Sequence, residues 1–500
     1  MVHVSDAIGR EAPLSRLSAA MFTSQASAIA MSMFILSIIN YLIKHLLRNF
    51  TRQSENDIPV VQTVVDQWTF GSKTAFEFYT TRTPFLKDCT YRYGRAFKFR
   101  MGRKTMHIVS TMTASKTFYF NRELDHKEPH FRALVALGSS GDRNLLAIPV
   151  HKHFLPSFGR RMSRLEIAQG ITAPLYIQLS QQFEHLSPNT HQLSEMIGRT
   201  LYDVLSRVVF GNSFPLNTYE DFVTLDDGFN MLAGPWPFVA YSAVRARERL
   251  LAVLTEYIKT QEEGKTETAS IISSALKSVQ SLPFREKAAC LLSLFWSIHS
   301  NLRKSIWWMT AHLARDPEAR CQIHDEISTT LQSFDQDFGS YLRKEPDSMF
   351  KEFSTVDSVV SETNRLFSLP GSFRVASVDT ELQLDNGRTM KVPRGDMVMF
   401  DTRPYHLDDS VYPDATCFQA DRFIEPKMDV PDIMSWGTGP HMCKGKVFAH
   451  HVMKVWAVAL LERWDIETTD EIPELAPASA NTIADPAQDI LITLHIRPQA

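Results

Sequence analysis

One cysteine of this chain lies in a glycine-rich loop immediately before an apolar helix. Residues 436–445 read Trp-Gly-Thr-Gly-Pro-His-Met-Cys-Lys-Gly, and glycines allow backbone conformations that other residues resist. Apolar residues then recur at helical spacing at Val447, Phe448, Val452, Val455 and Trp456. Cys443 is therefore predicted at a helix N-terminus, where backbone N–H groups and the helix dipole stabilise a thiolate. The alternative is a small buried apolar cysteine beside a turn.

This loop resembles the haem-binding signature of cytochromes P450, in which an aromatic residue and a glycine precede the cysteine and a glycine and an alanine follow it. The matching residues are Trp436, Gly439, Cys443, Gly445 and Ala449. Tryptophan stands where phenylalanine is usual. The resemblance implies heme b with Cys443 as the axial thiolate of its iron, and Trp436, Gly437 and Gly445 beside the cofactor.

A second segment resembles another part of the same family. Glu362 and Arg365 are three residues apart on one helical face, where they can pair. Residues 418–423 resemble the family segment whose arginine, here Arg422, joins that pair. Arginine suits this role because its planar fork forms bidentate bonds and stays charged when buried. The resemblance implies that Glu362, Arg365 and Arg422 form a structural triad that locks the core beneath the haem.

Two further residues match positions that bind the haem propionates. Arg374 follows Arg365 by nine residues, and His441 precedes Cys443 by two. Taken singly, each could be an ordinary surface or capping side chain. The resemblance implies that both contact the propionates.

The length and periodicity predict one large, mainly α domain with small β-sheets. The chain has 500 residues, of which 44% are hydrophobic, enough for one extensive core. Apolar residues alternate in residues 97–101 and 106–108 around Gly102, which predicts a hairpin. A second hairpin is predicted around Asn386-Gly387, a dipeptide favoured in tight turns. The predicted fold is the cytochrome P450 fold over 61–500, preceded by an N-terminal transmembrane helix.

No charged residue occurs from Leu17 to Ile43, and this segment is long enough to span a bilayer. A cleaved signal peptide and an interfacial helix are the alternatives. We expect a tail over 1–16, a transmembrane anchor over 17–43 and a linker over 44–60. Positive charges after the anchor and the family resemblance favour the endoplasmic reticulum membrane, with a single span and the catalytic domain facing the cytosol.

Composition excludes several other classes of protein. The five cysteines are odd in number and irregularly spaced, which argues against a disulfide framework or a zinc site. The net charge of −3, with no basic run, argues against nucleic acid as a partner.

The helix expected to cross the distal haem face departs from the usual family pattern. Asn301 stands where a threonine is usual, and Ser300 stands where an acid is usual. This pattern resembles the branch that contains sterol 7α- and 12α-hydroxylases and prostacyclin synthase. Asn301, assisted by Ser300, is thus the candidate catalytic residue, either relaying protons through water or orienting a substrate oxygen. His299 could extend a relay or simply pack in the core, and Arg303 and Lys304 are interpreted as solvated or haem-edge charges.

The resemblance implies a monooxygenase that uses O2 and electrons from an NADPH-cytochrome P450 reductase, with cytochrome b5 as a possible second donor. Lys444, Lys446 and Lys454 are candidates for the reductase-binding surface. The expected substrate is an apolar, polycyclic sterol or terpenoid-like molecule of a secondary-metabolite pathway. A haem-thiolate isomerase or dehydratase that needs no external electrons is the alternative. A haem-binding sensor without turnover is a third reading.

Overall fold

The computed structural model describes residues 58–497, except 235–236, 265–269, 333–337, 347–351, 425–432 and 480–481, and also Ser37. The predicted tail and anchor and most of the linker therefore lie outside the described residues. None of the helices described is both long and apolar enough to cross a membrane.

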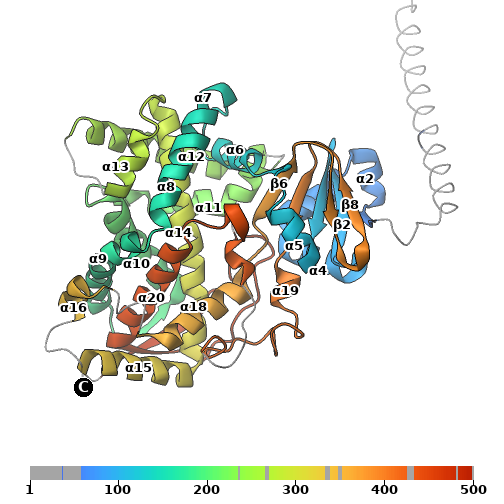
Figure 1. The fold of residues 1–500 in the computed structure, drawn as a ribbon. Coiled ribbons are helices and arrows are strands. Elements are labelled where there is room, and N and C mark those ends of the chain that lie inside the picture. The colour runs from blue at the N-terminus through green and yellow to red at the C-terminus, as the bar shows by residue number, and fades with distance from the viewer. Residues whose placement is uncertain are drawn as a thin grey trace, which may run out of the picture. The chain divides into compact units, whose positions relative to one another are not determined.

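Helices make up most of the chain (Figure 1). The first helices along the described chain are α2 (Val64–Thr69), α3 (Ser72–Thr80), α4 (Arg82–Tyr93), α5 (Met112–Tyr119), α6 (Lys127–Ala136), α7 (Arg143–Ile148), α8 (Leu155–Met162), α9 (Leu165–Glu184), α10 (Leu193–Leu205) and α11 (Tyr219–Ala233). The later helices are α12 (Tyr241–Glu262), α13 (Ser270–Lys277), α14 (Phe284–Arg315), α15 (Pro317–Gln332), α16 (Phe338–Lys344), α18 (Ser354–Phe367), α19 (Arg403–His406) and α20 (Lys446–Arg463).

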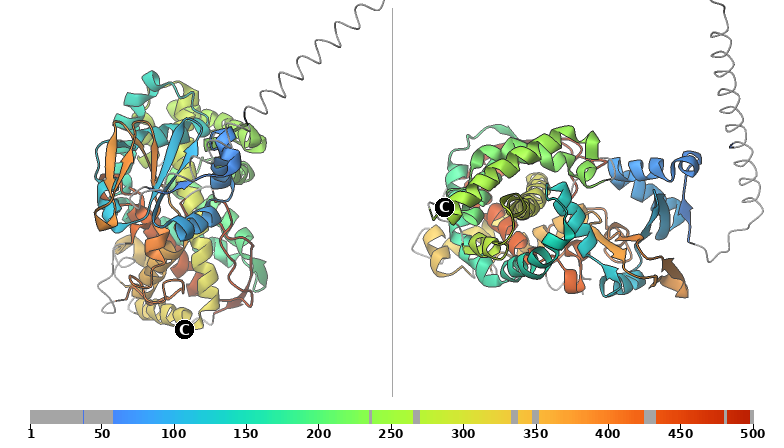
Figure 2. Two further views of the ribbon diagram at one scale, coloured as in Figure 1. Left: turned by 90° about the vertical axis from the view of Figure 1, so that its right-hand side faces the viewer. Right: turned by 90° about the horizontal axis from the view of Figure 1, so that it is seen from above.

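Helix α14 is the longest element and runs through the middle of the helical part, as the view from above in Figure 2 shows. It packs against α10, α12, α18 and α20, while α20 packs along α9. This helix ends just before Asp316-Pro317. Proline disfavours the helical conformation of the residue before it and lacks an N–H, so α14 stops at Arg315 and Pro317 begins α15.

The strands form three small sheets. The largest has six strands in the order β1 (Val60–Val61), β2 (Ala96–Met101), β3 (Lys104–Val109), β9 (Met397–Phe400), β6 (Ser372–Ala376) and β4 (Leu124–Asp125). A second sheet joins β10 (Trp464–Glu467), β11 (Leu491–Ile496) and β5 (Thr190–Gln192), and the third pairs β7 (Thr380–Gln383) with β8 (Thr389–Val392).

Both predicted hairpins are present. Strands β2 and β3 pair antiparallel with Phe97 opposite Ile108, and Gly102 turns the chain with a positive φ of 64°. Strands β7 and β8 pair with Leu382 opposite Met390, and the turn passes through a short 3₁₀ segment, Asp385–Gly387.

The two faces of the large sheet bury separate apolar clusters because side chains alternate along a strand. One cluster joins Phe97, Phe99 and Met399 to Phe78 and Phe85 of α3 and α4. The other joins Val398 and Phe400 to Phe118 and Tyr119 of α5. On β6, Phe373 packs against the first cluster, whereas the guanidinium of the next residue, Arg374, lies over the ring of Phe118 in the second.

Candidate active site

The cysteine loop folds back on itself just before α20. The backbone N–H of Cys443 donates to the carbonyl of Trp436 at 2.8 Å, which closes the loop. Gly437 and Gly439 have positive φ values of 65° and 70°, and a β-carbon on Gly439 would lie 3.1 Å from the ring of Phe120. The glycines are needed here, since a larger residue would strain the backbone at either position and would also crowd Phe120 at position 439.

Cys443 lies three residues before Lys446, the first residue of α20, and it is exposed. Burial among the surrounding atoms raises the pKa of its thiol, while backbone N–H groups of Gly445 and Lys446 and the charge of Lys444 lower it. Two N–H donors aimed at one accessible sulfur suit a thiolate. A cation bound to that sulfur would supply the remaining stabilisation, since metal ligation deprotonates a thiol outright.

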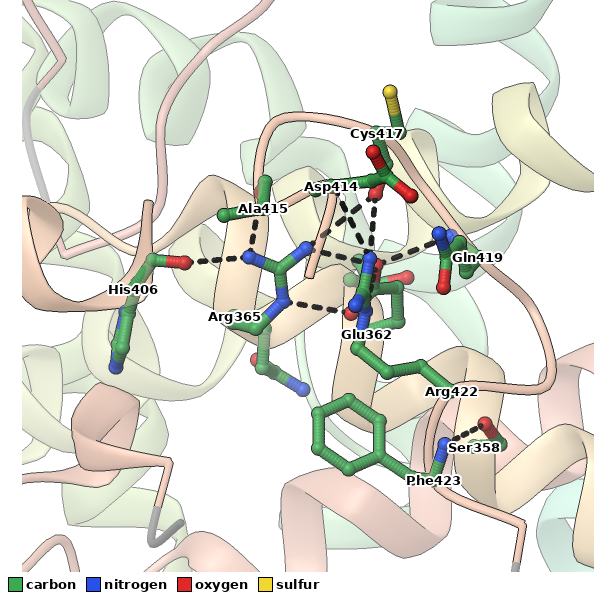
Figure 3. A network of polar contacts seen from close by, with 12 residues as sticks. Ser358, Glu362, Arg365, His406, Asp414, Ala415, Cys417, Gln419, Arg422 and Phe423 are labelled. Carbon is green, nitrogen blue, oxygen red and sulfur yellow. Dashed lines mark hydrogen bonds and ion pairs between the residues drawn. The ribbon is translucent and has the colours of Figure 1, made fainter. Parts of the chain in front are cut away.

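The predicted triad is assembled beneath this loop. On α18, Arg365 pairs with Glu362 through its Nε and Nη2 atoms at 2.7 and 2.8 Å (Figure 3). Arg422 donates from Nε to Oε1 of Glu362 at 3.0 Å. All three side chains are buried, so the bidentate geometry offsets the loss of hydration.

The triad also fixes the chain between α19 and the cysteine loop. Arg365 donates to the carbonyls of His406 and Ala415, and Arg422 donates to those of Pro413 and Cys417 (Figure 3). The segment that leads to Cys443 is thereby held by charge-assisted bonds rather than by a sheet or helix.

A cluster of basic and imidazole side chains lies beside the loop. The rings of His126 and His441 have centroids 3.5 Å apart, and that of His130 lies 5.5 Å from His126. Burial, with the charge of His441 next, lowers the pKa of His126 to about 3. The charge of Arg374 lowers the pKa of both His126 and His441, which places the guanidinium near them.

The sequence singled out Arg374 and His441 as propionate contacts, which stays a prediction, and did not single out His126 and His130. These two lie at the start of α6, far from any motif, and only the fold brings them to the loop. Among the titratable groups described, Asp125 is the one carboxylate that raises the pKa values of Arg374, His130 and His441. The cluster therefore offers several donors and is poor in anions.

On the distal helix α14, Asn301 is half-buried and contacts the segment before β11. Its Oδ1 accepts from the hydroxyl of Thr482 at 3.1 Å, and its Nδ2 lies 3.5 Å from the carbonyl of Ser297. The backbone of Thr482 accepts from Leu369, and Gly371 lies against its side chain. Asn301 thus lies where α14, the approach to β6 and the Thr482 segment meet.

Ser300 is turned the other way. It is fully buried, and its hydroxyl donates to Oδ1 of Asp226 on α11. Asp226 also accepts from the Trp296 indole at 2.9 Å and forms ion pairs with Arg303 and Lys304 at 3.2 and 3.4 Å. The structure brings Ser300 to a buried carboxylate, which the sequence analysis did not identify.

The interpretation of Arg303 and Lys304 as solvated or haem-edge charges is wrong for Lys304, which is 2% exposed. Burial opposes ionisation of Asp226, but the charges of Lys304 and Arg303 outweigh it and lower the pKa of Asp226. Lys304 also pairs with Asp485 at 2.9 Å. Arg303, Lys304 and Asp485 line a polar pocket of about 280 Å³, and the two cations of this lining also pair with Asp226 of α11.

His299 packs in the core. It is 2% exposed, lies among the rings of Tyr202, Phe210 and Phe295, and forms a hydrogen bond of 3.3 Å with Ser206. Burial lowers its pKa to about 3, so it is neutral. Of the two interpretations of His299, packing in the core agrees with this geometry.

A family model described as Cytochrome P450 matches residues 66–491. The chain belongs to the cytochrome P450 family. The predicted cytochrome P450 fold is confirmed, whereas the transmembrane helix predicted before it lies outside the described residues. Members of this family are haem-thiolate oxidoreductases with iron.

Relatives of this P450 are distant. It is 24% identical to Cytochrome P450 7A1 of Sus scrofa over 459 residues, which cover 83% of this chain and 89% of that protein. It is 27% identical to Prostacyclin synthase of Bos taurus over 229 residues, 42% of this chain and 46% of that protein. The predicted likeness to this branch is confirmed.

Among solved structures, the retinoic acid bound cyanobacterial CYP120A1 matches with a TM-score of 0.68 at 20% identity. The match covers 84% of this chain and 96% of that chain. This likeness shows that the two proteins share a fold.

The residues of this P450 fit the family cofactor. An accessible thiol that accepts two backbone N–H groups suits an iron ligand, and a donor-rich, anion-poor cluster suits two propionates.

On the surface side of the loop, Lys444 and Lys446 are exposed, as expected for partner contacts. Lys454 is 1% exposed and pairs with Asp357 at 2.7 Å, so its predicted place on the partner surface is wrong. Its position on α20 faces α18 instead of solvent.

Proposed function

We propose that this P450 is a monooxygenase that inserts one oxygen atom of O2 into an apolar, polycyclic, sterol- or terpenoid-like substrate. The observation that carries the proposal is the accessible Cys443 beside a cluster of donors. Relatives named 7-alpha-hydroxycholest-4-en-3-one 12-alpha-hydroxylase and Cholesterol 7-alpha-monooxygenase support the substrate class. A biosynthetic pathway for a secondary metabolite remains our proposal for its setting.

Cys443 would hold the haem iron through its sulfur, with Trp436, Gly437 and Gly445 forming the loop around it. Arg374 and His441 would donate to the propionates, joined by His126 and His130. The bound haem supplies activation of O2 toward a C–H bond. The chain supplies a dry, rigid site, since the triad fixes the segment that carries the cysteine loop.

The proton supply is assigned to three residues. Asp226 would first take up a proton from the pocket through its ion-pair partners and become a carboxylic acid. That acid would then give its proton to Oγ of Ser300 while the rotated Ser300 hydroxyl releases its own proton to a water held by the amide of Asn301, which returns Asp226 to the carboxylate. The hydrogen bond between Ser300 and Asp226 supports this route, because it joins the position of the missing acid to a carboxylate.

Electrons are proposed to come from an NADPH-cytochrome P450 reductase, with cytochrome b5 as a second donor. Exposed Lys444 and Lys446 beside the cysteine loop would attract an acidic partner surface. Residues 17–43 would anchor the protein in the endoplasmic reticulum membrane, with the catalytic domain in the cytosol.

The test is mass spectrometry with heavy-isotope O2 on a panel of sterols and terpenoids, using membranes that contain the protein. Each substrate is incubated with and without NADPH and reductase. We expect one heavy oxygen in a product only when the reductant is present. Incorporation of oxygen from water, or no labelled product with any member of the panel, would contradict the proposal.

A haem-thiolate isomerase or dehydratase is the second candidate. Asn301 in place of the usual threonine and the likeness to prostacyclin synthase favour it. In that case a product forms without reductant and without label from O2. Oxygenated substrates, such as hydroperoxides, therefore belong in the same panel.

A further inference from the structure

A buried arginine lies apart from the cysteine loop and the triad. Arg82 is the first residue of α4, and only 7% of it is exposed. Its guanidinium lies over two aromatic rings, 5.1 Å from the centroid of Phe78 and 5.8 Å from that of Phe373. Aromatic faces attract a cation but do not satisfy its N–H groups.

The guanidinium is short of hydrogen-bond acceptors. Its Nη2 donates to Oδ1 of Asn230 on α11 at a long 3.3 Å, and its Nε is buried without a partner among the described residues. No ion pair of Arg82 occurs in the described part of the chain. Tyr79 is the one titratable group that raises the pKa of Arg82 there, and burial lowers it.

An uncompensated buried cation is costly. The penalty for burying a charge is recovered only when an anion and good hydrogen bonds are present, and here both are missing. By contrast, buried Arg365 forms a bidentate pair with Glu362 and donates to further carbonyls. Arg365 therefore has an anionic partner and several acceptors for its N–H groups, whereas Arg82 has, among the residues that the structure describes, no anionic partner and no acceptor for its Nε.

A series of contacts connects the neighbours of Arg82 with Asn301. Asn230 donates from Nδ2 to the carbonyl of Ser479, and the backbone N–H of Thr83 donates to that of Pro477. Thr482, farther along the same segment, donates to Asn301. A second connection runs through β6, since Phe373 follows the residues that pack against Thr482.

We propose that Arg82 is the binding site for an anionic group of the substrate, a carboxylate first of all. The proposal rests on the monooxygenase function above and narrows its substrate class to polycyclic acids. Nε and the free edge of the guanidinium would donate to the two carboxylate oxygens, with the Asn230 side chain beside them. The apolar skeleton would then extend toward Asn301.

The physical reason for a carboxylate is geometric. A guanidinium presents two parallel N–H groups that match two carboxylate oxygens, and a charge-assisted pair is about twice as strong as a neutral one. A neutral hydroxyl or ketone could accept one N–H but would leave the charge unbalanced. The site therefore distinguishes an acid from its ester.

The test is a spectral titration of the haem-loaded, full-length protein with two pairs of probes, lithocholic acid and abietic acid, each with its methyl ester. We expect at least one acid to bind about tenfold or more tightly than its ester. Arg82→Met should weaken binding of that acid about 10- to 100-fold and leave the ester unchanged. Equal affinity of acid and ester, or no binding of either acid, would overturn the proposal.

The unfolding temperature and a matched control variant distinguish a role of Arg82 in substrate binding from a role in the fold. Arg92, on the same helix, is exposed and pairs with Asp88, so Arg92→Met should change neither affinity nor folding. If Arg82 serves the substrate, Arg82→Met should unfold at the same temperature as the parent or higher, with unchanged haem content. A lower unfolding temperature with unchanged acid binding would assign Arg82 to the fold. The labelled-oxygen experiment tests the monooxygenase function separately, since binding needs no turnover.

Discussion

The hydroxyl of Ser300 donates to the carboxylate of Asp226 across the interface between α14 and α11. The next residue, Asn301, faces a different neighbour, Thr482. Two adjacent residues of one helix thus join a buried, charged network to the place where the substrate is proposed to lie. A helix rotates by about 100° per residue, which is why neighbours in sequence serve different faces.

Asp226→Asn is expected to uncouple electron consumption from product formation. The amide can still accept the Ser300 hydrogen bond but does not exchange protons as a carboxylate does. Product formed per NADPH should fall at least about tenfold, with more peroxide and a larger solvent isotope effect. Glu220→Gln, at an exposed glutamate of the same helix that lies outside the pocket lining, is the control and should behave like the parent. Equal coupling in both variants would rule out the proposed proton route.

Cys443→Ser is expected to abolish the carbon-monoxide absorption signature of a haem thiolate. Serine keeps the loop geometry but provides no thiolate for the iron. Difference spectroscopy of the reduced protein measures this directly. Cys321→Ser, at an exposed cysteine on α15, should keep the full signature. Survival of the signature in Cys443→Ser would mean that another residue holds the iron.

Glu362→Gln is expected to prevent stable folding around the haem. The change leaves Arg365 and Arg422 buried without their shared carboxylate. Loss of one partner of a buried ion pair costs about 3–5 kcal/mol. Chemical unfolding and haem content of the purified protein measure the effect, and Glu318→Gln, at an exposed glutamate of α15, is the control. Normal haem content and stability in Glu362→Gln would contradict the structural role of the triad.

Asp401 is expected to make stability decrease as the pH rises. Its carboxyl is buried, and burial raises its pKa to about 6, above the value of the unfolded chain. The folded state therefore holds the Asp401 proton more tightly than the unfolded chain does. The resulting contribution to the free energy of unfolding is lost as the pH rises from about 4 through 6. At about 1.4 kcal/mol per pKa unit, the loss is about 3 kcal/mol at most.

Asp401→Asn removes this titration while keeping an acceptor for the backbone N–H of Arg403. The difference in unfolding free energy between variant and parent, measured at pH 4.5 and pH 7.5, should shift in favour of the variant at the higher pH. A difference that does not change with pH would show that Asp401 titrates normally.

Lys444 and Lys446 are expected to speed reduction by the reductase at low salt. Replacing both with alanine should slow haem reduction at low ionic strength and flatten its salt dependence, because screened attractions no longer contribute. Stopped-flow absorbance measures the rate. Lys391, an exposed lysine in β8, provides a control substitution to alanine. Unchanged rate and salt dependence in the double variant would remove these lysines from the partner surface.

The sequence was sufficient where the determining interactions are local. The turn at Gly102, the end of α14 before Pro317 and the helix after Cys443 follow from residues within a few positions. The contact between Glu362 and Arg422 is not local, and it was predicted only because the family resemblance links the two segments.

The parts that sequence reasoning missed depend on long-range packing. Nothing in the pattern of α11 distinguishes buried Asp226 from exposed Asp227, because the choice depends on how α11 is rotated against α14. Lys454 was misplaced for the same reason, since Asp357 of α18 draws it inward. Arg82 belongs to no sequence motif. What distinguishes it is that its buried guanidinium lacks, in the described part of the chain, an anion and an acceptor for Nε, which only the structure shows.

The triad also determines when this protein can complete its fold during synthesis. The pair between Glu362 and Arg365 forms within α18, but its remaining partners lie between His406 and Arg422. Until the ribosome has released those residues, the pair must stay hydrated or bury charge without compensation. The segment with Cys443 follows later still, so all partners of the triad are synthesised before the sulfur that is proposed to bind iron.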